Sequence, residues 1–107
     1  MTLDDLHLDL ATLAELCQRY GIARLDAFGS FVRGNARPDS DLDLLVSLKP
    51  GVTLGMEFLQ FAIDLETLVG RRVDLLERHL VEGDDQRPIF RREVLRQTKR
   101  LYGSAAA

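Results

Sequence analysis

The sequence predicts a small α/β or α+β fold in which helices pack on a mixed β-sheet. Three observations support this prediction. Short apolar segments bounded by glycine or proline are typical of strands. They alternate with longer segments whose apolar residues have helical spacing, a pattern typical of layered folds. The length of 107 residues suits one domain with one modest core, and we therefore treat residues 1–107 as a single domain.

The first expected element is a helix over residues 3–20. Thr2 and Asp5 form a weak capping box at its start, and Gly21 ends it. The stripe of apolar residues is too short for a sustained heptad repeat, so it predicts a face buried in the core. Its members recur at spacings of three and four: Leu3, Leu6, Leu10, Leu13, Cys17 and Tyr20.

Three strands and a second helix follow. Strands are expected over residues 22–28, 42–47 and 72–77, because each is a short apolar segment next to turn-forming residues. Between the second and third strands, residues 53–69 have apolar side chains at helical spacing. Gly70 then stands where a helix C-cap is expected.

The C-terminal part predicts a short basic helix over residues 88–102. Pro88 suits its first turn, and Leu101 is among the apolar residues expected to dock it. The last residues, 103–107, are expected to form a frayed tail.

Charge is distributed unevenly along the chain, although the net charge is only −3. Residues 1–86 hold 8 Lys and Arg against 16 Asp and Glu, whereas residues 87–107 hold 6 against 1. In the expected basic helix, Arg92, Arg96 and Lys99 would share one side. That side could be solvated, contact phosphate or bind another protein. The acidic average argues against strong direct binding of nucleic acid.

Composition excludes several classes of protein. No apolar run approaches the roughly 20 residues that span a bilayer, and the acidic N-terminus does not resemble a signal or transit peptide. A single cysteine, Cys17, excludes an internal disulfide and a cysteine-based zinc site. We expect a cytoplasmic protein without membrane association, with Cys17 buried and with His7, His79 and Asp26 exposed.

The residues that point to chemistry lie between residues 29 and 46. Gly29 and Ser30 close one expected strand, and ten residues later Asp41 and Asp43 open the next. Alternation along a strand puts both carboxylates on one face, about 6.5–7 Å apart at Cα. Such a pair is costly unless compensated, and magnesium takes oxygen ligands while leaving positions open for phosphate. Gly29 would let backbone approach a ligand, and Ser30 would offer its hydroxyl and amide to phosphate.

This pattern resembles the signature of the nucleotidyltransferases of the DNA polymerase beta superfamily, in which Gly-Ser is followed after ten residues by Asp-x-Asp. Its finer form, with Arg33, Gly34 and Ser40 in the flanking places, is similar to the minimal nucleotidyltransferases, known as MNT or MntA-like proteins. The resemblance covers roughly residues 3–102. It implies the polymerase-beta-type nucleotidyltransferase fold, and Asp74 stands where that superfamily places a third carboxylate.

The resemblance also implies a reaction and roles for these residues. Asp41, Asp43 and Asp74 would be catalytic and would hold two magnesium ions, with Asp74 nearest the acceptor hydroxyl. ATP would be the substrate. The nucleotide-binding residues would be Gly29, Ser30, Arg33 and Ser40.

The resemblance further implies a partner. Minimal nucleotidyltransferases are commonly encoded beside a HEPN-domain protein, with which they form a toxin–antitoxin pair. The chain would transfer AMP from ATP to a tyrosine of the HEPN ribonuclease and silence it, as part of a hetero-oligomer. The short sequence after the signature favours an acceptor supplied by such a partner. Two alternatives stay open: adenylylation of a small hydroxyl compound such as an aminoglycoside, and neutralisation of the toxin by contact alone.

Overall fold

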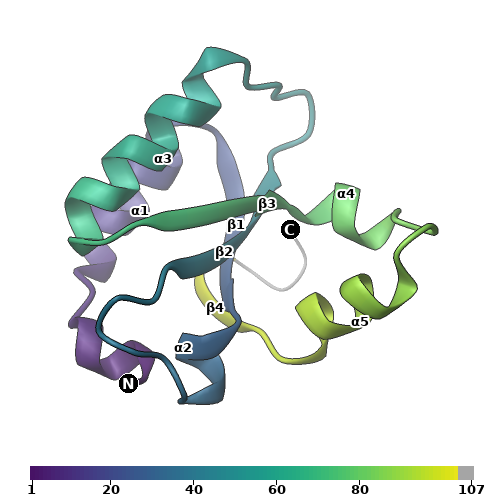
Figure 1. Ribbon diagram of the computed structural model, residues 1–107. Coiled ribbons are helices and arrows are strands. Elements are labelled where there is room, and N and C mark those ends of the chain that lie inside the picture. Colours follow the sequence, from purple (N-terminus) through teal and green to yellow (C-terminus); the bar gives the residue numbers. More distant parts are fainter. Residues whose placement is uncertain (104–107) are drawn as a thin grey trace.

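A computed structural model describes residues 1–103 and shows a four-stranded sheet with helices on both faces (Figure 1). The strands are β1 (Ile22–Phe28), β2 (Leu42–Leu48), β3 (Val73–Glu77) and β4 (Lys99–Gly103), and their order across the sheet is β3-β2-β1-β4. Strands β2 and β3 are parallel, whereas β1 is antiparallel to β2 and to β4. The sheet is therefore mixed, as the sequence predicts.

The main core lies between one face of the sheet and two helices, α1 (Leu10–Arg19) and α3 (Met56–Val69). Alternation along each strand sends every second side chain to this face. Phe31, from the single-turn helix α2 (Ser30–Arg33), completes the core and is 1% exposed. The buried residues that the sheet and the two long helices contribute include Leu25, Ala27, Leu44, Val46, Leu13, Cys17, Phe61 and Leu65.

The opposite face carries a smaller apolar cluster under α4 (Arg78–Glu82) and α5 (Pro88–Arg96). Its buried members are Phe28, Leu45, Val81 and Val94. Helix α4 follows β3 directly and is too short for the periodicity that reveals helices in sequence. The sequence analysis accordingly missed it.

The predicted N-terminal helix is two elements. A 3₁₀ turn, η1 (Leu3–Leu6), ends at His7, which adopts a left-handed conformation with φ 49°, and α1 begins only at Leu10. Asp9 caps α1, since its Oδ1 accepts a hydrogen bond of 3.2 Å from the amide of Thr12. Leucines recur at helical spacing through both η1 and α1, so their spacing alone does not show that the helix is interrupted at residues 7–9.

The predicted basic helix over residues 88–102 is wrong in its second half. Helix α5 ends at Arg96, and Lys99–Gly103 form β4 on the free edge of β1. Pairing with β1 satisfies backbone groups that a buried central strand would otherwise leave without partners. Leu101 packs on the main core from this strand, not from a helix. Gly103, predicted to begin a frayed tail, is instead the last residue of β4, and the rest of that prediction, residues 104–107, lies outside the described residues.

The remaining elements agree with the predicted positions, with shifted ends. Helix α3 starts at Met56, three residues later than predicted, and ends at Gly70, whose φ of 73° is the left-handed conformation expected of a glycine C-cap. Within residues 1–103, no helix is both long enough and apolar enough to cross a membrane.

Candidate active site

Two neighbouring parallel strands bring three aspartates together at one end of the sheet. Asp43 is the second residue of β2, and its Cα partner on β3 is Asp74. Asp41 lies two residues before Asp43, directly ahead of the first residue of β2. Leu42 and Leu44, which flank Asp43, point into the main core. Asp43 and Asp74 therefore belong to the opposite face, and the charge of Asp41 is near enough to affect the pKa of Asp43.

The glycine of the signature lies directly against this group. Phe28, the last residue of β1, is paired with Asp43, so the turn at Gly29 passes beside the Asp43 carboxylate. A Cβ atom at Gly29 would come within 2.2 Å of Asp43 Oδ2, and the φ of Gly29 is 77°. Both the close approach and the left-handed backbone require glycine here. The link between Gly29 and Asp43, which the signature only suggests, is thus a direct contact.

Burial is the main cause that raises the pKa of Asp43 to about 6, and the negative charges of Asp74 and Asp41 raise it further. The positive charge of Arg33 acts in the opposite direction. Arg33 therefore compensates the negative charge at Asp43 only in part. The donor set consists of carboxylate oxygens, the ligands that magnesium prefers, and thus fits a divalent cation.

The carboxylates are not in a ready-made ligand arrangement. Among residues 1–103, no group of three acidic, histidine or cysteine side chains is already placed to hold one metal ion. Asp41 is directed instead toward Arg72, whose Nε lies 3.4 Å from Asp41 Oδ1. The Arg72 side chain is 83% exposed, and an ion pair of this kind contributes at most about 1 kcal/mol. A divalent cation could therefore displace it readily.

We expect Asp43→Asn to stabilise the protein at neutral pH in the presence of a chelator. The raised pKa means that the folded state favours protonated Asp43, so stability falls as the pH rises from about 4 to about 6. After allowance for solvent screening, the free energy of unfolding of the variant should exceed that of the wild type by on the order of 1 kcal/mol, which corresponds to about 4 °C in Tm. Thermal melts at pH 7.5 and pH 4 test it. The Tm difference should vanish at pH 4, and an equal or lower Tm of the variant at pH 7.5 would contradict it.

The other predicted nucleotide-binding residues lie around the same end of the sheet. Ser30 begins α2, and Arg33 ends it. Arg33 is exposed and close enough to Asp43 to affect its pKa. The hydroxyl of Ser40 is engaged in its own turn, where Oγ accepts a hydrogen bond of 2.8 Å from the amide of Arg37. Contacts of these side chains with nucleotide stay a prediction.

Asp26 was predicted to be exposed, and this is wrong. It is completely buried, and its carboxylate accepts hydrogen bonds from Arg24 Nε at 2.8 Å and from an Arg78 guanidinium nitrogen at 2.7 Å. Arg78 comes from α4, an element that the sequence analysis missed, so the partner that allows Asp26 to be buried was not visible. The predictions for Cys17, which is buried, and for His7 and His79, which are exposed, are confirmed.

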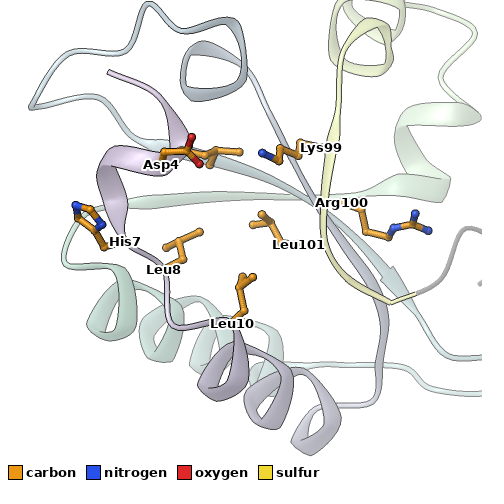
Figure 2. A pocket seen from close by; sticks show the side chains of 8 residues that line it. Asp4, His7, Leu8, Leu10, Lys99, Arg100 and Leu101 are labelled. Atoms are coloured by element: carbon orange, nitrogen blue, oxygen red, sulfur yellow. The ribbon is translucent and has the colours of Figure 1, made fainter.

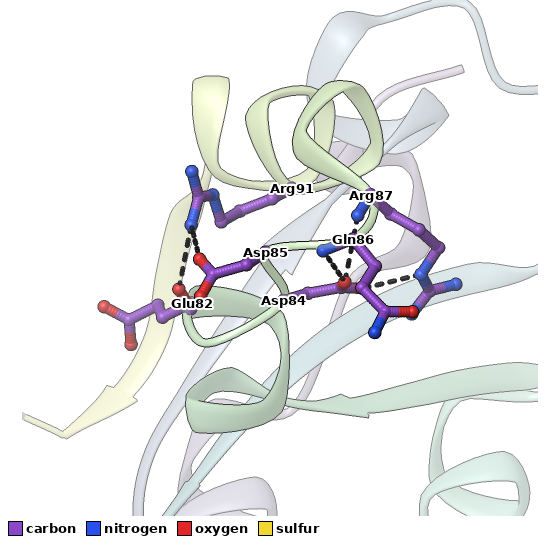
Figure 3. Close-up of polar contacts among 6 residues, drawn as sticks. All are labelled: Glu82, Asp84, Asp85, Gln86, Arg87 and Arg91. Atoms are coloured by element: carbon purple, nitrogen blue, oxygen red, sulfur yellow. Dashed lines mark hydrogen bonds and ion pairs between the residues drawn. The ribbon is translucent and has the colours of Figure 1, made fainter.

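Part of the basic C-terminal segment is neutralised internally (Figure 3). Arg91 donates to the Glu82 carbonyl and to Asp85, and Arg87 pairs with Asp84. These contacts hold the loop between α4 and α5. Lys99, predicted to share a helix side with Arg92 and Arg96, lies instead on β4.

The sheet edge opposite β3 carries a separate groove of about 270 Å³ (Figure 2). Leu8 and Leu10 from the N-terminal segment face Lys99 and Leu101 of β4 across it. Since β1 stands between β4 and β2, and none of the three aspartates lines the groove, it is distinct from the group of carboxylates.

The nucleotidyltransferase domain family matches residues 11–101, which include every residue of the proposed site. The chain belongs to this family. The predicted enzyme class, nucleotidyltransferase, is confirmed, as is the resemblance to the minimal nucleotidyltransferases.

Individual relatives agree with this assignment. The protein adenylyltransferase MntA of Thermococcus cleftensis is 36% identical over 80 residues, which cover 75% of this chain and 80% of that protein. A structure solved as that of a minimal nucleotidyltransferase is 40% identical, with a TM-score of 0.67 over 92% of this chain and 94% of the other. This match confirms the predicted fold.

A complex from Shewanella oneidensis, of a tri-AMPylated HEPN toxin with an MNT antitoxin, shows the same fold. The matched chain is 17% identical, with a TM-score of 0.61, and the match covers 94% of this chain and 75% of the other.

Proposed function

We propose that this nucleotidyltransferase transfers AMP from ATP to a hydroxyl of a protein, a tyrosine of a HEPN ribonuclease toxin, and thereby acts as its antitoxin. The observation that carries the proposal is the group of three carboxylates formed by Asp41, Asp43 and Asp74. Their negative charges repel one another, and the backbone turn at Gly29 packs closely against Asp43. The likeness to a protein adenylyltransferase and to chains of an AMPylated HEPN complex supports the choice of acceptor.

In this reaction the tyrosine oxygen attacks the α-phosphorus of ATP, pyrophosphate leaves, and the hydroxyl proton passes to solvent or to a nearby base. Asp41 and Asp43 would hold two magnesium ions, and Asp74 would hold the one nearest the acceptor. Such ions lower the pKa of an attacking hydroxyl and neutralise the triphosphate and the leaving pyrophosphate.

The protein's own groups have separate tasks. Gly29 and Ser30 would bind the triphosphate at the start of α2, where backbone N–H groups have no partner within the helix. Arg33, at the other end of that turn, would add positive charge toward the phosphates. Asp74 is exposed on the edge strand β3, so a protein acceptor can reach it without passing through the core.

The test is incubation of the protein with Mg-ATP and a cognate HEPN protein. We expect intact mass spectrometry to show one or more adenylyl groups on the partner, localised to tyrosine by fragmentation, together with loss of ribonuclease activity. Omission of ATP is the control. If the two proteins bind each other and the partner gains no adenylyl group, the proposed activity is wrong.

A further inference from the structure

Arg71 lies in the connection between α3 and β3, three residues before Asp74, and makes contact with both halves of the signature. We infer that Arg71 is a positioning residue, which fixes the backbone of Ser40 so that Asp41 is presented beside Asp43. The inference rests on the proposed function for the role of Asp41. It assigns to Arg71 no contact with substrate.

The first set of contacts holds the segment that leads into Asp41. One guanidinium nitrogen of Arg71, Nη1, donates to the carbonyl of Pro38 at 3.1 Å and to that of Ser40 at 3.0 Å. The Ser40 carbonyl belongs to the peptide group that joins Ser40 to Asp41, so the hydrogen bond to it holds the backbone directly before Asp41, and the bond to Pro38 holds the turn two residues earlier.

The second contact joins the same side chain to the phosphate-binding turn. The guanidinium of Arg71 stacks over the ring of Phe31, with its central carbon 4.9 Å from the ring centroid. Phe31 follows Ser30 in α2 and is almost completely buried, so its ring is a fixed surface. Arg71 therefore ties the turn at Gly29 and Ser30 to the segment before Asp41.

No equivalent support comes from the turn itself. Its own hydrogen bonds, Ser40 N to Arg37 O at 3.0 Å and Arg37 N to Ser40 Oγ at 2.8 Å, close the turn but do not attach it to the body of the protein. Among the described residues, Arg71 is the one side chain outside this turn that hydrogen-bonds to residues 37–40. Removal of Arg71 would leave the turn closed but attached only through its flanks, at Ala36, whose carbonyl accepts a hydrogen bond of 2.8 Å from the N-terminal amine of Met1, and at Leu42, whose amide donates to the Arg72 carbonyl at 2.9 Å.

A displacement of Asp41 would weaken the hold on a divalent cation before it affected the fold. We expect Arg71→Ala to bind Mn²⁺ about tenfold more weakly, measured by electron paramagnetic resonance without acceptor or nucleotide, since one carboxylate would be misplaced. The rate of AMP transfer should fall about 100-fold, because a catalytic group misplaced by about 1 Å can slow a reaction by that factor. Guanidinium ion added to Arg71→Ala should restore part of both, because it can occupy the vacated place over Phe31.

The matched control is Arg37→Ala, which removes an exposed arginine from the same turn while keeping the backbone bonds of that residue. It should bind Mn²⁺ like the wild type and show no rescue. Mn²⁺ binding by a folded Arg71→Ala within threefold of the wild type would overturn the inference, as would weakened binding that guanidinium does not improve.

If Arg71→Ala does not fold, Arg71→Lys decides the question. Lysine keeps the charge but lacks the planar group that both stacks and donates, so weaker Mn²⁺ binding supports the inference and wild-type binding overturns it. The Mn²⁺ measurement needs no protein acceptor. Absence of AMP transfer by the wild type would thus count against the proposed function alone.

Discussion

Replacing both Asp41 and Asp43 with Asn will reduce AMP transfer to the HEPN partner by at least about 1,000-fold. Asp41 lies directly before β2, Asp43 is its second residue, and both are half-buried. The change removes both negative charges while it keeps the size of the side chains. Loss of charge stabilisation at a phosphoryl centre raises the activation free energy by several kcal/mol. Each 1.4 kcal/mol added to that barrier slows the reaction about tenfold. Intact mass spectrometry of the partner over time measures the effect.

Stability and binding controls separate loss of chemistry from loss of structure. The double variant should melt no lower than the wild type, because burial and the repulsion from Asp74 and Asp41, which raise the pKa of Asp43, disfavour a charged carboxylate and not a neutral amide. Asp39→Asn, an exposed neighbour in the same segment, should transfer AMP at the wild-type rate. If the double variant still silences the ribonuclease in cells, contact alone suffices and the catalytic proposal fails as the antitoxin mechanism.

Asp26→Ala will cause the largest loss of stability, about 3–5 kcal/mol. Asp26 is completely buried, and its carboxylate is the shared partner of Arg24 and Arg78, whose side chains are only 20% and 19% exposed. Its removal leaves two largely buried guanidinium groups without their common counter-ion. The total free energy of unfolding of a domain is about 5–15 kcal/mol, so a loss of this size is a large share of it. We therefore expect the Tm to fall by more than about 10 °C.

The matched control for this prediction is Asp85→Ala. It also removes the carboxylate of an Asp–Arg pair, with Arg91 at 3.4 Å, but the Asp85 side chain is 91% exposed. Water replaces the lost partner there, so the change should be within about 0.5 kcal/mol. Urea unfolding of both variants measures the difference. Equal losses for Asp26→Ala and Asp85→Ala would show that burial of the Asp26 pair does not matter.

Part of the site could be predicted because it is encoded over short distances. Alternation within β2 sends Asp43 to the face opposite Leu42 and Leu44, since the backbone geometry of a strand leaves no other arrangement. Gly29 and Ser30 end β1 because glycine tolerates a turn that other residues do not. These are properties of a few consecutive residues, and the structure agrees with them.

Other features depend on residues far apart in the chain. Asp26 looks like an exposed strand residue until α4 brings Arg78 against it, 52 positions later. Residues 99–103 continue a basic, partly apolar segment that also suits a helix, and the unpaired edge of β1 decides that they form a strand.

The sequence by itself thus determined the class of fold, the family and the face on which Asp43 lies. Each follows from local periodicity or from a motif of fixed spacing. Only the tertiary structure decided that Asp74 stands beside Asp43, that Asp26 is buried and that Arg71 reaches the segment before Asp41. Strand pairing and charge compensation are satisfied by whichever residues the complete fold brings together, and no local pattern specifies that choice.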